Sequence, residues 1–181
     1  MTSIDNEATM AAIQMTGNIK FRPLKARDWE AVSKIYRQGI ETGIATFEQA
    51  VPDWKGWNKS HMKSCRLIAE VDNEIAGWGA LTAVSSRCVY AGVAEVSVYV
   101  SKDHRGQKIG SKLLEQLIQA SEKEGIWTLE AGIIPENKSS IKIHEVLGFR
   151  KIGYREKIGR LNGKWQDTVL YERRSKIVGK D

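Results

Sequence analysis

The chain has 181 residues, of which 41% are hydrophobic and 28% are charged. This length fits one domain with a sizeable core and is short for two. No apolar run is long enough to span a bilayer. The two cysteines, Cys65 and Cys88, form neither a CxxC pair nor a metal-like cluster with the three histidines. These totals predict a cytoplasmic protein with reduced thiols, no membrane association and no metal site.

The net charge of +6 points to a polyanionic partner. Nucleic acid and a cofactor with several phosphates both meet this condition. No aromatic RNP-like run or basic recognition helix supports nucleic acid. A group at the C-terminal end, Arg173, Arg174 and Lys176, is interpreted as a solvated tail. The other basic residues that cluster lie around one loop, at Lys102, His104, Arg105, Lys108 and Lys112.

Hydrophobic periodicity divides the chain into strands and helices. Asp28 is placed to cap the first helix, and Asp72–Asn73 and Asn162–Gly163 are typical hairpin turns. Strands are expected at 19–23, 66–71, 74–81, 93–100, 127–134, 149–154 and 168–172. Helices are expected at 29–40, 53–63, 110–123 and 138–147.

The resulting order, β-α-α-β-β-β-α-β-α-β-β, predicts an α/β fold with one mixed sheet and helices on its faces. We expect a flexible N-terminal extension over residues 1–18, a single domain over 19–175 and a tail over 176–181.

The loop 101–108 follows an alternating strand and opens directly into an amphipathic helix. A helix start offers unpaired N–H groups and a partial positive charge, and glycine lets the backbone approach a ligand closely. The loop carries neither GxGxxG nor GxxxxGK[ST], which excludes the dinucleotide fingerprint and the P-loop. Taken alone, it is either an anion site or a plain strand-to-helix turn with surface lysines.

Residues 105–110, RGQKIG, resemble the (Q/R)xxGx(G/A) signature of the GNAT acetyltransferases, with Lys108 where a glycine is usual. The later stretch N137-x-x-S140 followed by HEVLGF is similar to the second cofactor segment of that family. The resemblance spans roughly residues 19–172. It implies a GNAT-like mixed, mostly antiparallel twisted sheet with helices on both faces, and acetyl-CoA as co-substrate. The cofactor-binding residues it implies are Val98, Tyr99, Val100, Arg105, Gly106, Gln107, Lys108, Ile109, Gly110, Ser111, Asn137 and Ser140.

Three further segments, AEVSVYV, IETGIATFE and GKWQD, resemble the phosphinothricin acetyltransferase branch of this family. The resemblance implies transfer of acetyl to the amino group of a small amino acid or analogue, of the phosphinothricin, methionine sulfone or methionine sulfoximine type. It also implies a homodimer.

Two residues are candidates for acid–base chemistry, because an amine must lose a proton before it attacks a thioester. Glu95 lies in the middle of a strand, on a face with Ser97 and Tyr99, where an unpaired carboxylate is costly to bury. The alternative is that Glu95 pairs with an arginine. His144 shares an inward helix face with Ser140, and is either catalytic or a satisfied core histidine. Neither cysteine is placed as a nucleophile.

The remaining site residues are assigned by role. A strand-edge amide near Val98–Val100 is the family's usual oxyanion donor. Asn137 and Ser140 can bind the pantetheine arm, or Asn137 can serve as a helix N-cap. An acceptor carboxylate favours an arginine, and the resemblance places it at Arg87. The predicted acceptor-site residues are Phe47, Glu48, Ser85, Ser86 and Arg87.

Three other functions remain open from the residues alone. The chain could acetylate a polyamine or another small amine, which would favour acidic walls over Arg87. It could be a non-catalytic acyl-CoA-binding module, with Lys108 marking decay of the loop. A basic nucleic-acid-binding protein is the third alternative, and it would bind with a steep salt dependence.

Overall fold

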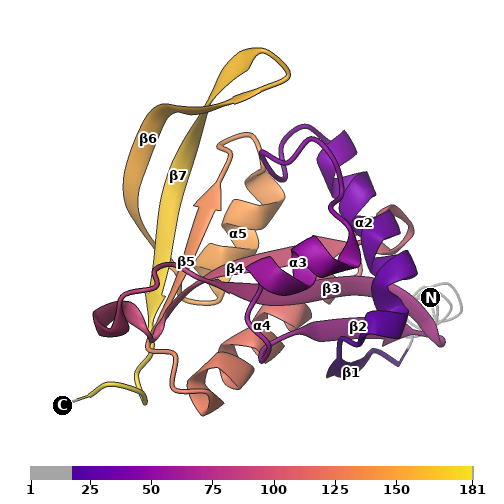
Figure 1. Ribbon diagram of the computed structural model, residues 1–181, viewed down its shortest axis with the longest axis horizontal. Helices are drawn as coiled ribbons and strands as arrows, with labels where there is room; N and C mark the ends of the chain where they lie inside the picture. Colours follow the sequence, from indigo (N-terminus) through magenta and orange to yellow (C-terminus); the bar gives the residue numbers. More distant parts are fainter. Residues whose placement is uncertain (1–17, 181) are drawn as a thin grey trace, which may run out of the picture.

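The computed structural model describes residues 18–180, and almost all of the predicted N-terminal extension lies outside them. One seven-stranded sheet forms the centre of the molecule, in the order β1-β2-β3-β4-β5-β7-β6 (Figure 1). Every neighbouring pair is antiparallel except β4 and β5. The predicted mixed sheet is confirmed. Its strands are β1 (Lys20–Pro23), β2 (Leu67–Val71), β3 (Glu74–Ala83), β4 (Val93–Val100), β5 (Thr128–Ile133), β6 (Arg150–Leu161) and β7 (Lys164–Arg174).

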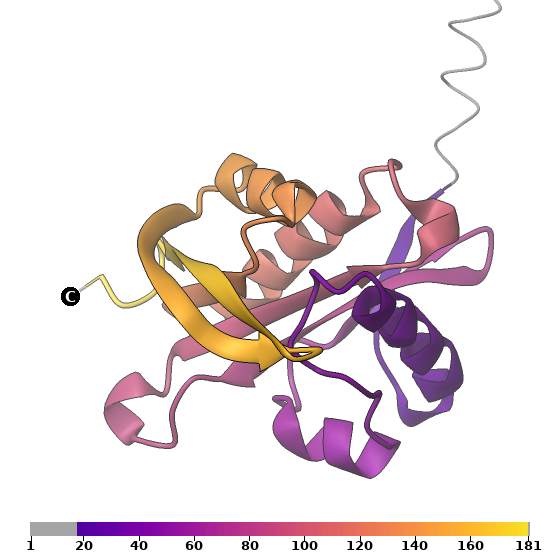
Figure 2. The same ribbon diagram turned by 90° about the horizontal axis from the view of Figure 1, so that it is seen from above.

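Within residues 18–180, four α-helices cover the sheet, and they lie on both of its faces (Figure 2). On one face, an apolar and aromatic cluster centred on Trp57 and Trp78 joins the first two helices to the sheet. On the other face, Leu113, Leu114 and Leu117 belong to the buried clusters under the third helix. The helices are α2 (Trp29–Glu41), α3 (Trp54–Ser60), α4 (Ile109–Lys123) and α5 (Lys138–Val146). Short 3₁₀ segments are η1 (Ala26–Asp28), η2 (Cys88–Tyr90) and η3 (Lys102–His104).

The sheet opens between its two parallel strands. Pairing of β4 with β5 covers only Val93–Glu95 opposite Thr128–Glu130. Beyond Glu95, β4 continues for five residues along β3 alone. The second half of β4 therefore has one free edge, and this edge faces the gap between the two strands.

Gly39 lies within α2 and serves close packing. A Cβ at this position would lie 2.6 Å from Cδ1 of Tyr99 on β4. The Tyr99 ring also stacks on Trp78, with ring centroids 4.6 Å apart. A glycine inside a helix weakens it when taken alone, but here the helix runs on to Glu41 and uses the missing side chain to approach the sheet.

Both predicted hairpin turns are confirmed. Asp72 and Asn73 join β2 to β3, and Asn162 and Gly163 join β6 to β7, all four with positive φ. Such left-handed pairs suit two-residue hairpins. The final hairpin is much longer than expected, with strands of 12 and 11 residues. Irregular register within β6 hides its strand pattern in the sequence.

Asp28 does not cap α2 through its side chain, contrary to expectation. Its carboxylate accepts hydrogen bonds from Arg22 at 2.8 and 2.9 Å and from the backbone N–H of Lys25 at 2.7 Å. Burial alone would raise the pKa of Asp28, but these hydrogen bonds and the Arg22 charge hold it below its usual range. The residue therefore joins β1 to the turn before α2.

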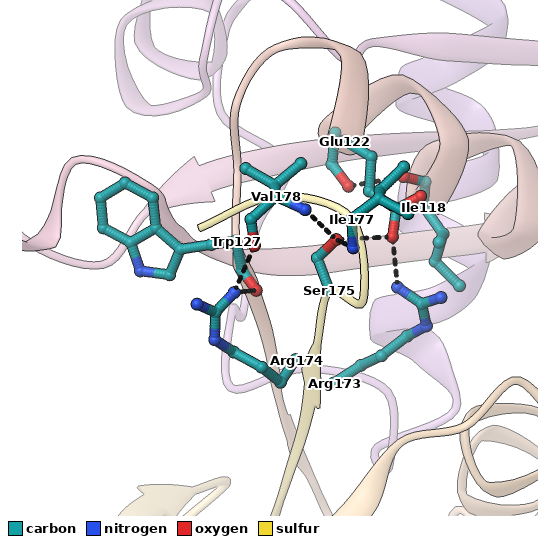
Figure 3. A network of polar contacts seen from close by, with 9 residues as sticks. Ile118, Glu122, Trp127, Arg173, Arg174, Ser175, Ile177 and Val178 are labelled. Carbon is teal, nitrogen blue, oxygen red and sulfur yellow. Dashed lines mark hydrogen bonds and ion pairs between the residues drawn. The ribbon is translucent and has the colours of Figure 1, made fainter. Parts of the chain in front are cut away.

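Arg173 and Arg174 bond with other parts of the chain and do not form the predicted solvated tail (Figure 3). Arg173 pairs with Glu122 of α4 at 3.0 Å. Arg174 donates to the Trp127 and Val178 carbonyls, each at 2.9 Å. These contacts attach the C-terminal end of the described chain to α4 and to the start of β5.

Candidate active site

The start of α4 presents free backbone N–H groups at the end of β4. Among residues 18–180, the amides of Ile109, Gly110 and Ser111 have no hydrogen-bond acceptor, and no side chain caps the helix. The preceding loop is fixed at its base, because Ser101 donates to the Ala76 carbonyl at 2.8 Å. A helix N-terminus with unpaired amides attracts an anion such as a phosphate.

Lys108 adopts a left-handed conformation, with φ 61° and ψ 12°, immediately before α4. Gly106 also has positive φ, at 79°. A left-handed residue other than glycine costs about 1–2 kcal/mol, which gives a physical reason why the family motif has glycine at position 108. The Lys108 side chain is exposed to solvent, so its charge lies at the rim of the anion site.

The backbone of β4 alternates between its two edges. The carbonyl oxygens of Ser97 and Tyr99 point toward β3, at 3.4 and 2.8 Å from the positions that a Cβ would take at Gly79 and Gly77. Since successive residues of a strand turn their N–H and C=O groups to opposite sides, those of Val98 face the gap beside β5. The same holds for Val100.

Tyr99 differs from the two valines. Its backbone is paired with β3, and its ring is enclosed by Gly39 and Trp78. Burial raises the pKa of Tyr99, and the neighbouring hydroxyls of Tyr36 and Thr46 also act on it. These contacts occupy Tyr99 within the fold and give it a structural role beside the predicted cofactor contact.

Asn137 caps α5, and this confirms the helix N-cap, one of its two predicted roles. Its Oδ1 accepts a hydrogen bond from the Ser140 amide at 3.2 Å. Its Nδ2 donates to the Ile44 carbonyl at 3.4 Å, which ties α5 to the loop after α2. α5 also approaches the anion site, because Cδ1 of Ile143 lies 3.7 Å from the Cβ position of Gly110.

His144 is buried, which favours the neutral form of its ring. Its Nδ1 lies 2.8 Å from the Ser140 carbonyl oxygen, which can only accept, so Nδ1 carries the proton. Nε2 is then an acceptor, and it has no partner among the described residues although it is buried. Burial lowers the pKa of His144. In this state the ring can take up a proton at Nε2 but cannot donate one there.

Glu95 lies at the point where β4 and β5 separate. It is opposite Glu130 in the register, and its Oε1 is 3.6 Å from the Cβ position of Gly132. The side chain is exposed to solvent, yet the surrounding protein removes enough water to raise its pKa. The Gly132 amide lowers the pKa, Glu130 raises it and Arg155 lowers it, and the net direction is upward.

The structure brings two of the predicted acceptor residues to the site. The Phe47 ring lies 2.7 Å from the Cβ position of Gly159 on β6. The charge of Glu48 adds to the effect of burial in raising the pKa of Tyr36. The loop after α2 contacts β6 through Phe47 and α5 through Ile44.

The other three acceptor candidates lie elsewhere. Ser85, Ser86 and Arg87 belong to the loop before β4, at the opposite end of that strand from α4. The Arg87 guanidinium lies over the ring of Tyr90, 5.5 Å from its centroid. Within residues 18–180, this loop makes no polar contact with Glu95. The acceptor role of these three residues stays a prediction.

Sequence reasoning missed Tyr36, Thr46 and Arg155. Tyr36 and Thr46 act on the pKa of Tyr99, and Arg155 is the positive charge that acts on Glu95. Thr46 could have been proposed from the sequence, because it is a hydroxyl-bearing residue inside the segment IETGIATFE, which resembles the phosphinothricin acetyltransferase branch. Among residues 18–180, no group of three or more potential metal ligands occurs, and none of the helices is long and apolar enough to cross a membrane.

The comparisons with known proteins agree with this geometry. The model of the acetyltransferase (GNAT) family matches residues 28–149. The phosphinothricin N-acetyltransferase of Alcaligenes faecalis is 31% identical over 159 residues, which cover 84% of this chain and 80% of the relative. The L-methionine sulfoximine/L-methionine sulfone acetyltransferase of Pseudomonas paraeruginosa is 37% identical over 83 residues, covering 46% of this chain and 48% of the relative.

Among solved structures, a GNAT superfamily phosphinothricin acetyltransferase from Sinorhizobium meliloti in complex with AcCoA has a TM-score of 0.79 and 26% identity. The alignment covers 90% of this chain and 96% of that one. The match of the family model to most of the domain, the identity to whole-length relatives and the shared fold lead to one conclusion. The chain belongs to the GNAT acetyltransferase family.

Proposed function

We propose that the protein transfers acetyl from acetyl-CoA to the amino group of a small amino acid or amino-acid analogue. The observation that carries this proposal is the row of free amides at Ile109–Ser111, at the end of the β4 edge that opens beyond Glu95. Together they offer a phosphate site, an extended-chain site and a base in one continuous region. The relatives named above act on phosphinothricin and on methionine sulfoximine or sulfone.

The chain's own groups fit acetyl-CoA in three places. The amides at the start of α4 would hold the pyrophosphate, with Arg105, Gln107 and the exposed Lys108 at the rim. The free edge at Val98 and Val100 would pair with the amide-containing pantetheine arm as an added strand. When bound, the cofactor supplies an activated thioester.

Glu95 acts as the general base in this proposal. It takes a proton from the acceptor ammonium, directly or through water. In a ternary complex the neutral amine then attacks the thioester carbon, the C–S bond of the tetrahedral intermediate breaks, and the remaining excess proton of the nitrogen passes to the coenzyme A thiolate, which leaves as the thiol. An N–H of Val98 or Val100 faces the side on which negative charge develops. His144 is a second acid–base candidate, and its unprotonated, unpartnered Nε2 suits proton uptake.

The same proposal extends to the assembly and location of the protein. We propose a homodimer, as the resemblance to the phosphinothricin branch implies, and a cytoplasmic enzyme with no nucleic-acid or membrane partner. A polyamine or other small amine is the alternative acceptor. Glu48 and Glu130 are the acidic residues beside the site that support this alternative.

A thiol-release assay with acetyl-CoA tests the proposal. The acceptor panel contains proteinogenic amino acids, methionine sulfone, methionine sulfoximine, phosphinothricin and polyamines. We expect release of coenzyme A with at least one acceptor of the amino-acid type. Release with polyamines alone would select the alternative acceptor class. Binding of acetyl-CoA without release with any acceptor would support a non-catalytic binding module instead.

A further inference from the structure

The sheet face that carries Glu95 continues across β5, β7 and β6, and two of its positions there are glycines. A Cβ at Gly132 would lie 3.6 Å from Oε1 of Glu95 and 3.9 Å from Cδ2 of Leu170. A Cβ at Gly153 of β6 would lie 4.0 Å from Cδ1 of the same leucine. Leu170 is opposite Gly132 on one side and Gly153 on the other. Gly132, Leu170 and Gly153 therefore form a strip across this face in which only the leucine carries a side chain.

Arg155 lies at the far side of this strip. It follows Gly153 by two residues and is opposite Thr168 in the register, so its side chain belongs to the same face. The side chain is exposed, and within the described residues it forms no ion pair. Arg150, on the same strand, is paired with Glu172. Arg155 thus keeps its positive charge available to a ligand.

The dimensions suit a small zwitterion. β5 and β6 are separated by one strand, which is about 10 Å between their backbones at roughly 4.8 Å a step. An arginine side chain is long enough to span part of this distance, and the Glu95 carboxylate reaches to Gly132. An α-amino acid carries its ammonium and its carboxylate on one carbon. The strip offers a carboxylate at one end and a guanidinium at the other, which is the complementary arrangement of charge.

We propose that Arg155 binds the α-carboxylate of the acceptor and thereby directs its amino group toward Glu95. A guanidinium binds a carboxylate through two parallel N–H···O bonds, which fix orientation as well as position. This inference rests on the proposed function. It assigns the carboxylate to β6, in place of Arg87 in the loop before β4.

The test measures steady-state kinetics for Arg155→Gln, with Arg150→Gln as a matched control on the same strand. The acceptors are methionine sulfone and its carboxamide, which lacks the α-carboxylate. We expect Arg155→Gln to raise KM for methionine sulfone about tenfold to a hundredfold, as for a lost hydrogen-bonded charge pair. KM for the carboxamide and for acetyl-CoA should change less than about twofold, since Arg155 contacts neither. Arg150→Gln should leave all three close to the wild-type values.

Arg155→Lys supplies a second readout. It keeps the charge but loses the paired donors, so KM for methionine sulfone should rise by less than in Arg155→Gln.

The groups facing Glu95 are Glu130, the Gly132 amide and Arg155, and the last of these lowers the pKa of Glu95. The acid limb of the kcat/KM profile should therefore move to higher pH in Arg155→Gln and stay in place in Arg155→Lys.

Two results would overturn the inference. One is an equal rise of KM for methionine sulfone and its carboxamide in Arg155→Gln. The other is that Arg87→Gln abolishes the preference for methionine sulfone over its carboxamide, whereas Arg155→Gln leaves that preference unchanged. The proposed function fails in a different way, by absence of thiol release from the wild-type protein with every amino-acid acceptor.

Discussion

Glu95 owes its proposed role to its immediate surroundings. The side chain stands where the parallel strands part, so one of its neighbours is a backbone amide of β5 and another is the Glu130 carboxylate. Its desolvation and Glu130 together raise its pKa above the ordinary value. A carboxylate with a raised pKa is a stronger proton acceptor in its ionised form.

Substitution of Glu95 by glutamine should lower kcat by about 10²–10⁴, the usual range for loss of a general base. KM for acetyl-CoA should stay unchanged, because the cofactor amides lie on α4. In the wild type, activity requires the ionised carboxylate. It should therefore be lost as pH falls through a pKa above the ordinary value, and this acid limb should be absent in Glu95→Gln. Unchanged turnover would assign the base to another residue.

Lys108 combines an unfavourable backbone conformation with a favourable charge. Lys108→Gly should stabilise the free protein by about 0.5–1 kcal/mol, since glycine adopts positive φ without a steric cost but loses more entropy on folding. The same change should weaken acetyl-CoA binding about twofold to fivefold at low salt, because a positive charge near a helix N-terminus and its anion is removed.

Lys108→Asn is the matched control for both effects. Asparagine tolerates the left-handed conformation and carries no charge, so it should weaken binding as much as glycine does. Tighter binding in Lys108→Gly, measured by calorimetry, would show instead that the lysine side chain crowds the amides.

At the scale of elements, the position of α2 against β4 depends on one missing side chain. Gly39→Ala places a Cβ within 2.6 Å of the Tyr99 ring, which must move. We expect a loss of about 1–3 kcal/mol from overpacking, reduced by the higher helix propensity of alanine. Denaturant unfolding measures this. Gly110→Ala is the control, because its Cβ would meet Val100 at an ordinary 3.4 Å.

Displacement of Tyr99 has a second expected effect. Thr46, in the loop that carries Phe47 and Glu48, neighbours the Tyr99 hydroxyl and lowers its pKa. Gly39→Ala should therefore raise KM for the acceptor more than KM for acetyl-CoA. A stability loss with both KM values unchanged would confine Gly39 to packing.

At the scale of the whole molecule, ligand binding should stabilise the fold. The proposed cofactor site is formed by β4, α4 and α5, which lie on both sides of the gap in the sheet. Coenzyme A at a hundred times its Kd should add about 2.7 kcal/mol to the free energy of unfolding. For a protein of this size, this corresponds to a Tm increase of roughly 5–10 °C. An increase with nucleic acid and none with coenzyme A would favour the nucleic-acid alternative.

The amino-acid sequence by itself determined the order of elements, both two-residue hairpins and the strand–loop–helix unit around Lys108. These features are local: apolar periodicity, turn residues and helix starts act over a few neighbouring positions. It also predicted Glu95 on the face opposite the β4 core residues, because alternation in a strand is local too.

Only the tertiary structure decided which distant residues meet. Arg155 shares a face with Glu95 because two intervening strands and an irregular β6 register place it there, and no short-range pattern encodes that pairing. Arg173 meets Glu122 across 51 positions of sequence for the same reason. Arg87, which the motif comparison favoured, lies at the other end of β4. Which charges act on one site depends on strand order and register, and these are set by packing of the whole sheet.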